Sequence, residues 1–269
     1  MITSIDQFTC KEWSQYKDSL SVTNCLLSWR VHYSLIIVLL VVTLAVWASI
    51  KTNKLTTAGA IAGGILAITI YLGIGWFGIM MLGIFFLLGT VATAWQAKTK
   101  TKLGIAEKDS GKRTLGQVFA NGGVAGLLGL LAIIYPDLLY IWALMTAGSF
   151  ASATADTLSS ELGSVYGTRF YNCISFKRDQ RGLDGVVSIE GLVIGIVGST
   201  IIATIYSIGY GWHTGGITIV LAGTLGNLAD SVLGATLERK GVLTNNVVNF
   251  LNTLIGALAA VTLYTAIPH

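Results

Sequence analysis

Four carboxylate side chains lie within long apolar stretches of the sequence: Asp156, Glu161, Glu190 and Asp230. Ionisable side chains are costly in a hydrocarbon environment and by default indicate function. Asp156 and Ser160 are four residues apart and share a helical face. Glu161 follows Asp156 by five residues, which places it about 140° further round an ideal helix. We therefore expect an acidic site that several helices assemble together.

The polar residues nearby are amides. Asn121 lies near the start of one apolar stretch, and Asn245, Asn249 and Asn252 share one helical face at the start of another. The three His and three Cys residues show no metal-ligand spacing. Hard oxygen ligands suit Mg²⁺, which proteins usually hold with one or two carboxylates and substrate phosphates. The alternatives are that the carboxylates pair with Lys and Arg of the loops, and that the Asn row joins helices.

Basic residues flank these acidic stretches, and Lys112, Arg113, Lys177 and Arg181 are candidates for binding phosphate oxygens. The same residues also signal membrane topology. For the cluster Lys98, Lys100 and Lys102 we favour the topological interpretation.

The composition defines the elements that must position these groups. The chain has 269 residues, of which 53% are apolar and 11% charged, and its mean hydropathy is +0.71. A soluble domain carries about 25% charged residues, so the composition excludes a cytosolic enzyme, a disordered chain and a nucleic-acid-binding protein with a basic face. The prediction is an all-α, polytopic membrane protein. Eight stretches approach the length needed to span a bilayer: 34–50, 55–72, 76–95, 118–135, 138–163, 185–208, 216–235 and 247–267.

The basic residues indicate the orientation. Fourteen Lys and Arg residues fall in the connections after spans one, three, five and seven, and none falls after spans two, four, six or eight. Because positive loops stay cytoplasmic, both termini are predicted outside and the acidic groups near the cytoplasmic surface. In a prokaryote this membrane would be the plasma (inner) membrane. Residues 1–33 are interpreted as a polar tail at the membrane interface. Residues 34–269 form one predicted membrane domain with catalytic loops at 96–117, 164–184 and 237–246.

Two short runs are alike, since both Asp156 and Asp230 follow Ala and precede a hydroxyl residue. Together with their neighbours, these runs resemble the integral membrane family DUF92, or transmembrane protein 19 family, which includes a plant phytyl-phosphate kinase. The resemblance covers roughly residues 50–267. It rests on four stretches: LGIAEK at 103–108 with QVFANGG at 117–123; ADTLSSELG at 155–163; KR at 177–178 with DGVVS at 184–188; and DSVLGATL at 230–237 with VNFLN at 248–252. Glu190 departs from the family pattern.

A more distant similarity is to the dolichol and phytol kinases, which use CTP. Their Asp, Ser and Gly positions correspond here to Asp156, Ser159–Ser160 and Gly163. The resemblance implies a CTP-dependent kinase acting on an isoprenyl-phosphate lipid. It implies that Asp156, Asp230 and Glu161 hold Mg²⁺ and that Ser160 contacts a phosphate or supports Asp156. Nucleotide and phosphate binding would fall to further polar residues: Lys112, Arg113, Asn121, Lys177, Arg181, Asp184, Asn249 and Asn252.

Two other functions fit the same residues. A CTP-dependent lipid cytidylyltransferase would also place Asp residues in membrane helices beside basic loops. An ion-coupled transporter would explain intramembrane carboxylates and Gly-rich helices, although the charges gather toward one side and the sequence shows no strong inverted repeat.

Overall fold

The computed structural model describes residues 19–104 and 111–267. Residues 1–18 of the predicted tail and residues 105–110, which hold part of the first family motif, lie outside the described residues. The chain divides into two units, residues 1–45 and 46–269. Helix α2 (Ser19–Lys51) holds the described part of the first unit and continues into the second. The helical turns therefore extend back into the segment predicted as a polar tail.

The prediction of an all-helical chain with eight spans is confirmed. Within the described ranges 19–104 and 111–267, eight helical segments are long and apolar enough to cross a membrane: Tyr33–Lys51, Thr57–Ile74, Trp76–Ala94, Leu115–Ile134, Pro136–Tyr166, Ile189–Tyr210, Thr214–Glu238 and Asn245–Ala266. Their bounds fall within a few residues of the predicted ones. The side of the membrane that each terminus occupies stays a prediction.

The helices of the second unit are α3 (Thr57–Ile74), α4 (Trp76–Ala94), α5 (Ala97–Lys102), α6 (Leu115–Ile134), α7 (Leu139–Tyr166), α8 (Ile189–Tyr210), α9 (Thr214–Leu233) and α10 (Asn245–Ala266). A short 3₁₀ turn, η2 (Pro136–Leu138), precedes α7, and a π-helical segment, η3 (Gly234–Glu238), extends α9.

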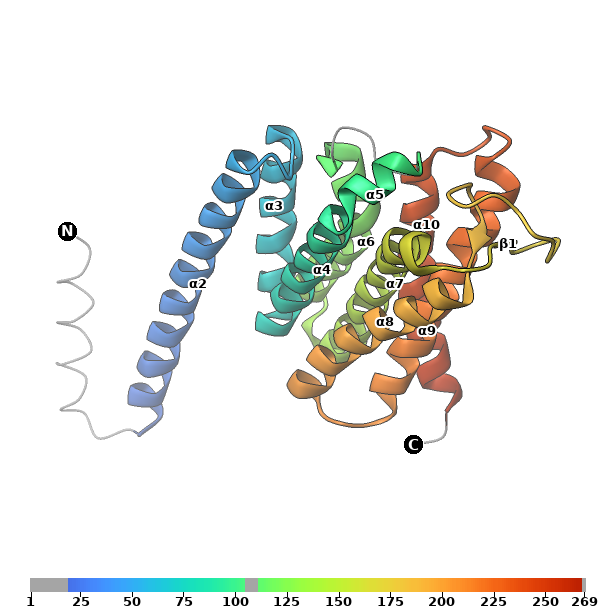
Figure 1. Ribbon diagram of the computed structural model, residues 1–269. Helices are drawn as coiled ribbons and strands as arrows, with labels where there is room; N and C mark the ends of the chain where they lie inside the picture. The colour runs from blue at the N-terminus through green and yellow to red at the C-terminus, as the bar shows by residue number, and fades with distance from the viewer. Residues whose placement is uncertain (1–18, 105–110, 268–269) are drawn as a thin grey trace. The chain divides into compact units, whose positions relative to one another are not determined.

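Helix α7 is the centre of the second unit. It packs against α4, α6, α8, α9 and α10 (Figure 1). Small side chains make this possible, because every residue from Thr146 to Ala155 is buried and all but Phe150 are small. At Gly148, an added Cβ would lie 2.5 Å from the carbonyl oxygen of Gly256 on α10. This close approach of two backbones through glycine is typical of membrane helices.

Local signals position the helix ends that later form the site. Thr114 begins α6 with a capping box: its hydroxyl accepts from the N–H of Gln117, while the Gln117 side chain accepts from the N–H of Thr114 at 2.8 Å. Ser188 begins α8 by accepting from the N–H of Gly191 at 3.1 Å.

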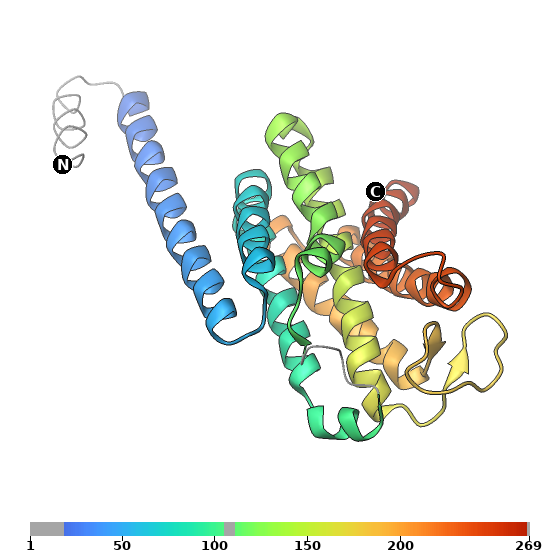
Figure 2. The same cartoon turned by 90° about the horizontal axis from the view of Figure 1, so that it is seen from above.

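The connection between α7 and α8 folds into a small hairpin, seen beside the end of α7 in Figure 2. Strands β1 (Tyr171–Asn172) and β2 (Val186–Val187) are antiparallel, with Tyr171 opposite Val187. This segment corresponds to the predicted loop 164–184, of which α7 occupies the first residues.

Candidate functional site

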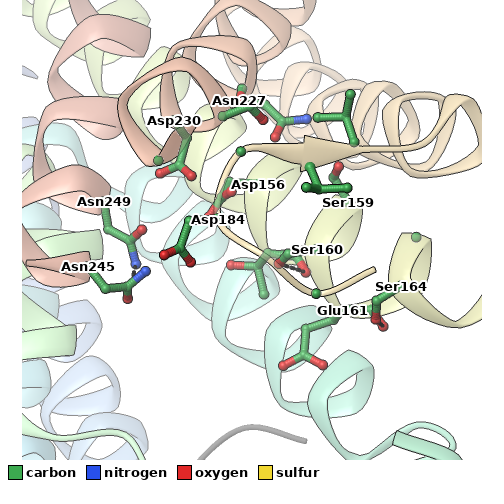
Figure 3. A pocket seen from close by; sticks show the side chains of 18 of the residues that line it. Asp156, Ser159, Ser160, Glu161, Ser164, Asp184, Asn227, Asp230, Asn245 and Asn249 are labelled. Carbon is green, nitrogen blue, oxygen red and sulfur yellow. Dashed lines mark hydrogen bonds between the residues drawn. The ribbon is translucent and has the colours of Figure 1, made fainter. Parts of the chain in front are cut away.

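A polar cavity of about 460 Å³ lies where several helices end (Figure 3). Its walls come from the last turns of α4, α7 and α9, the first turns of α6 and α10, the hairpin and η3. The lining includes most of the predicted site residues: Arg113, Asn121, Asp156, Ser160, Glu161, Asp184, Asp230 and Asn249. Residues far apart in the sequence therefore meet at one end of the second unit.

Two aspartates from different helices form the acidic centre of this cavity. The carboxyl groups of Asp156 on α7 and Asp230 on α9 lie within hydrogen-bonding reach of each other. The carboxylates of Asp184 and Glu238 add negative charge nearby. Such a group of like charges requires a proton or a cation to compensate it.

This arrangement fits a hard divalent cation shared with phosphates. Within residues 19–104 and 111–267, no three His, Cys, Asp or Glu side chains converge as a ready metal-ligand set. The pair Asp156 and Asp230 instead supplies the one or two carboxylates with which Mg²⁺ is usually bound when substrate phosphates complete its coordination. Carboxylate oxygens are also the ligand type that Mg²⁺ prefers.

The three aligned Asn residues of α10 occupy two kinds of position: two line the cavity and one is buried behind its wall. Asn245 and Asn249 line the cavity, and the amide of Asn249 donates to Asn245 at 3.5 Å. Asn252 is fully buried and donates to Asp230 Oδ1 at 3.4 Å. The hydroxyl of Ser152 on α7 bonds the Asn252 side chain and its carbonyl. Asn252 thus supports Asp230 from behind the cavity wall, although its position in the sequence predicted a contact with the ligand.

Glu161 lines the cavity, but its carboxylate bonds to residues other than the two aspartates. Its Oε2 forms an ion pair with Lys100, and its Oε1 accepts from the Thr93 hydroxyl at 2.9 Å. Its shared metal role with Asp156 and Asp230 stays a prediction. Ser160 is exposed in the cavity and donates to the carbonyl of Thr157 at 3.2 Å.

Among the described residues, Arg113 is the one Lys or Arg that lines the cavity. Its backbone is anchored because its N–H donates to the Lys54 carbonyl at 3.0 Å. Its guanidinium lies 5.4 Å from the ring centroid of Phe85 and 5.8 Å from that of Phe86, both on α4. This stacking holds a positive charge at the cavity wall.

The other predicted basic residues are outside the lining. Lys112 contacts Asn53 at 3.5 Å. Arg181 donates to the carbonyl of Gly167 at 3.0 Å and stacks on Phe170, which itself lines the cavity. Lys177 is exposed on the hairpin. The structure therefore does not bring these three side chains together with the aspartates.

Arg239 fastens the hairpin over the cavity. It donates to Asp179 Oδ2 at 2.9 Å and to the carbonyl of Asp184. The backbone N–H of Gln180, followed by the Arg239 side chain, holds the pKa of Asp179 below its usual value. Gly185 adopts a φ of +71°, and a Cβ there would collide with the segment after Asp230. These contacts place the Asp184 carboxylate at the cavity.

The hairpin also contacts α9 through a cysteine. The thiol of Cys173 donates to the carbonyl of Ser231 at 3.1 Å, and burial raises the pKa of this thiol.

Several lining residues are not among those predicted from the sequence. Glu238 on η3 and Asn227 on α9 both line the cavity. Asn227 lies three residues before Asp230, so its helical spacing was a usable signal. No regular helical spacing indicates Glu238, because the π-helical winding of η3 determines where its side chain lies. Glu190 is outside the lining and accepts from the Thr168 hydroxyl at 2.6 Å.

Comparisons with known proteins agree with this architecture. Residues 40–257 match the family described as integral membrane protein DUF92. An uncharacterized membrane protein of Synechocystis is 34% identical over 218 residues, which is 80% of this chain and 84% of that protein. An uncharacterized membrane protein of Methanocaldococcus jannaschii is 35% identical, over 80% of this chain and 87% of its own length.

A plant protein is also similar. Protein VTE6, chloroplastic, of Arabidopsis thaliana is 31% identical over 77% of this chain and 64% of its own length. No solved structure shows a significant match to the chain.

Proposed function

Because the chain belongs to the DUF92 family of integral membrane proteins, we propose that it is a membrane kinase for isoprenyl monophosphates. The phosphoryl donor is CTP or another nucleoside triphosphate. The acceptor is a lipid such as phytyl or geranylgeranyl phosphate, and the product is its diphosphate. The observation that carries this proposal is the aspartate pair, Asp156 with Asp230, in a polar cavity among apolar helices. The family resemblance of the motifs around both residues supports the choice of reaction.

The reaction is a simple exchange of phosphorus–oxygen bonds. An oxygen of the acceptor phosphate bonds to the γ-phosphorus, and the bond from that phosphorus to the β,γ-bridging oxygen breaks. The nucleoside diphosphate leaves with the electron pair. Since the acceptor phosphate is already ionised, the site needs no strong general base. Phosphoryl transfer instead requires positioning and neutralisation of charge.

The residues of the cavity match these two requirements. Asp156 and Asp230 are the proposed ligands of Mg²⁺, which when bound would neutralise negative charge on the phosphates. The Arg113 guanidinium adds a fixed positive charge at the wall. Asn249 and Asn121 offer amide groups to the nucleotide or the acceptor. The Oδ1 atom of Asn121 is buried and has no hydrogen-bond partner among the described residues, so it is ready to accept from a ligand.

The apolar surface explains why such a kinase spans a membrane. Many large apolar side chains on the helices are exposed, among them Phe119 and Leu127 on α6 and Phe250 on α10. The isoprenyl tail lies among apolar helix faces while its phosphate enters the polar cavity. We place the cavity on the cytoplasmic side, where CTP is available, in agreement with the distribution of basic residues.

Transfer of label tests the reaction. The purified protein is incubated with Mg²⁺, isoprenyl monophosphates of several chain lengths, and CTP labelled at either the α- or the γ-phosphorus. Label from the γ-position in the lipid, with CDP as co-product, is expected. Label from the α-position would instead show a cytidylyltransferase. Uptake by proteoliposomes without nucleotide consumption would show a transporter, and either result would overturn the proposal.

A further inference from the structure

The short helix α5 carries a buried lysine. Gln96, just before it, has a φ of +53° in the left-handed region, and the helix lies against the end of α4. Lys100 is 2% exposed, whereas Lys98 and Lys102 on the same helix are exposed. A charged ammonium is buried only where it is well paired, so its partners define its role.

These partners join α4 to α7. The Lys100 ammonium donates to the carbonyls of Ala92, at 2.7 Å, and Thr93, at 3.4 Å, and forms an ion pair with Glu161. The two carbonyls belong to the last turn of α4, where a positive charge is favourable. The Thr93 hydroxyl donates to the second oxygen of Glu161. One ammonium therefore ties the carboxyl end of α4 to a carboxylate of α7.

A second contact links the same helix ends. Trp95, directly after α4, donates through its indole N–H to the hydroxyl of Tyr166 at 2.8 Å. Tyr166 is the last residue of α7. Two side-chain contacts, Lys100 with Glu161 and Trp95 with Tyr166, thus link the carboxyl ends of α4 and α7.

The position of α4 matters for the cavity because α4 supports Arg113. The guanidinium stacks on Phe85 and Phe86, and a Cβ at Gly89 would collide with it. A shift of α4 would therefore move the positive charge that lines the cavity. Lys100 and Arg113 thus contact the same helix, Lys100 at its last turn and Arg113 at Phe85 and Phe86.

We propose that Lys100 is a positioning residue, which pairs with Glu161 to fix α4 against α7 and so places Arg113 for phosphate binding. Glu161 acts within this pair and leaves metal binding to the two aspartates. The kinetic test of this inference rests on the proposed function. The buried ion pair between Lys100 and Glu161 can be tested without it. Removing one partner of a buried ion pair is costly, whereas replacing both by neutral groups is often close to neutral. A catalytic carboxylate would show no such rescue.

The test compares Lys100→Met, Glu161→Gln and the double variant. We expect Lys100→Met to raise the KM for the lipid phosphate about tenfold or more, with a smaller change in kcat. Adding Glu161→Gln should recover most of this loss. The Mg²⁺ concentration for half-maximal activity should stay unchanged in all three proteins. Lys100→Arg, which keeps the charge, should recover part of the activity, and Lys98→Met and Lys102→Met are matched controls that should behave as the wild type.

Two results would overturn the inference. The first is a double variant as inactive as the more impaired single variant, and the second is a raised Mg²⁺ requirement in Glu161→Gln. Thermal unfolding of the purified proteins tests the pair without any activity. Lys100→Met should lower the unfolding midpoint by about 5 °C or more, and the double variant should regain most of it. If the wild type transfers no phosphoryl group, the proposed function fails and the unfolding cycle alone decides whether the pair exists.

Discussion

The side-chain amide of Asn252 donates to Asp230 at 3.4 Å, although the two residues belong to different helices. The same Asn side chain is bonded by Ser152 on α7. One buried amide thus connects the three helices whose ends surround the aspartate pair. It fixes the orientation of Asp230, on which any shared cation would depend.

Asn252→Ala should therefore lower both stability and activity. The substitution removes the amide that donates to Asp230 and the side-chain partner of Ser152, which keeps its bond to the backbone carbonyl of residue 252. The loss of buried hydrogen bonds costs about 1–3 kcal/mol. Thermal unfolding in detergent should show a lower midpoint, and γ-label transfer should fall. Asn249→Ala is the comparison, because Asn249 lines the cavity and is only half-buried. It should lower transfer while leaving the midpoint unchanged; an equal loss of stability in both variants would contradict the assignment.

Asp156→Asn and Asp230→Asn should each reduce transfer about a hundredfold or more. Each change keeps the shape of the side chain but removes one of the two charges available to a cation. In the absence of Mg²⁺ neither variant should be less stable than the wild type, since the repulsion between the carboxylates is relieved.

Asp137→Asn is the control, because it makes the same substitution at the exposed 3₁₀ turn before α7, outside the cavity lining. This variant should transfer label normally. Wild-type turnover in either cavity variant would refute the proposed metal role of the pair.

Arg113→Met should raise the KM for the phosphate substrates about tenfold or more, because the cavity loses its fixed positive charge. Arg113→Lys should recover part of the affinity but lack the stacking on Phe85 and Phe86. Initial rates at varied lipid and CTP concentrations will show which substrate is affected. Lys51→Met removes an exposed charge at the end of α2 and should leave both KM values unchanged. Equal effects of the two methionine variants would point to a general loss of surface charge.

Cys173 provides a pH-dependent readout of the hairpin. Because burial raises the pKa of its thiol, a smaller fraction is thiolate at any pH below that value. Only the thiolate reacts with iodoacetamide, so alkylation should be slower than for an exposed thiol. The rate should continue to rise with pH beyond the range where an ordinary thiol reaches its plateau.

The measurement uses protein carrying Cys10→Ser and Cys25→Ser, so that Cys173 is the remaining thiol. Unfolding in detergent and urea should restore the rate of an exposed thiol. A native protein whose rate reaches its plateau in the ordinary thiol range would show that the hairpin does not bury Cys173.

Much of the scaffold follows directly from the sequence. The apolar stretches predict all eight spans, because a bilayer-crossing helix needs about 20 apolar residues and little else. The meeting of Asp156 with Asp230 also follows. Successive spans run in opposite directions, so the fifth and seventh spans run in the same direction and end at the same side of the membrane. The similar runs around both residues strengthen that expectation.

The partners of individual charges could not be predicted. Three lysines alternate along α5, and the sequence does not show which one turns inward. Burial of Lys100 depends on its position against the end of α4 and on Glu161 lying opposite. Likewise Lys112 and Arg113 are neighbours in the sequence, but only Arg113 lines the cavity. Periodicity gives the face of a regular helix and carries no such information for connecting segments.

The π-helical segment η3 has a consequence for the lining of the cavity. Asp230, Gly234 and Glu238 line it at intervals of four residues. In a regular α-helix, two full turns from Asp230 would bring Leu237 to this position. The wider π turn accommodates one additional residue, so an acid takes the place of a hydrocarbon side chain in the lining. The winding of these five residues therefore decides whether the cavity lining carries a carboxylate or an apolar side chain at this point.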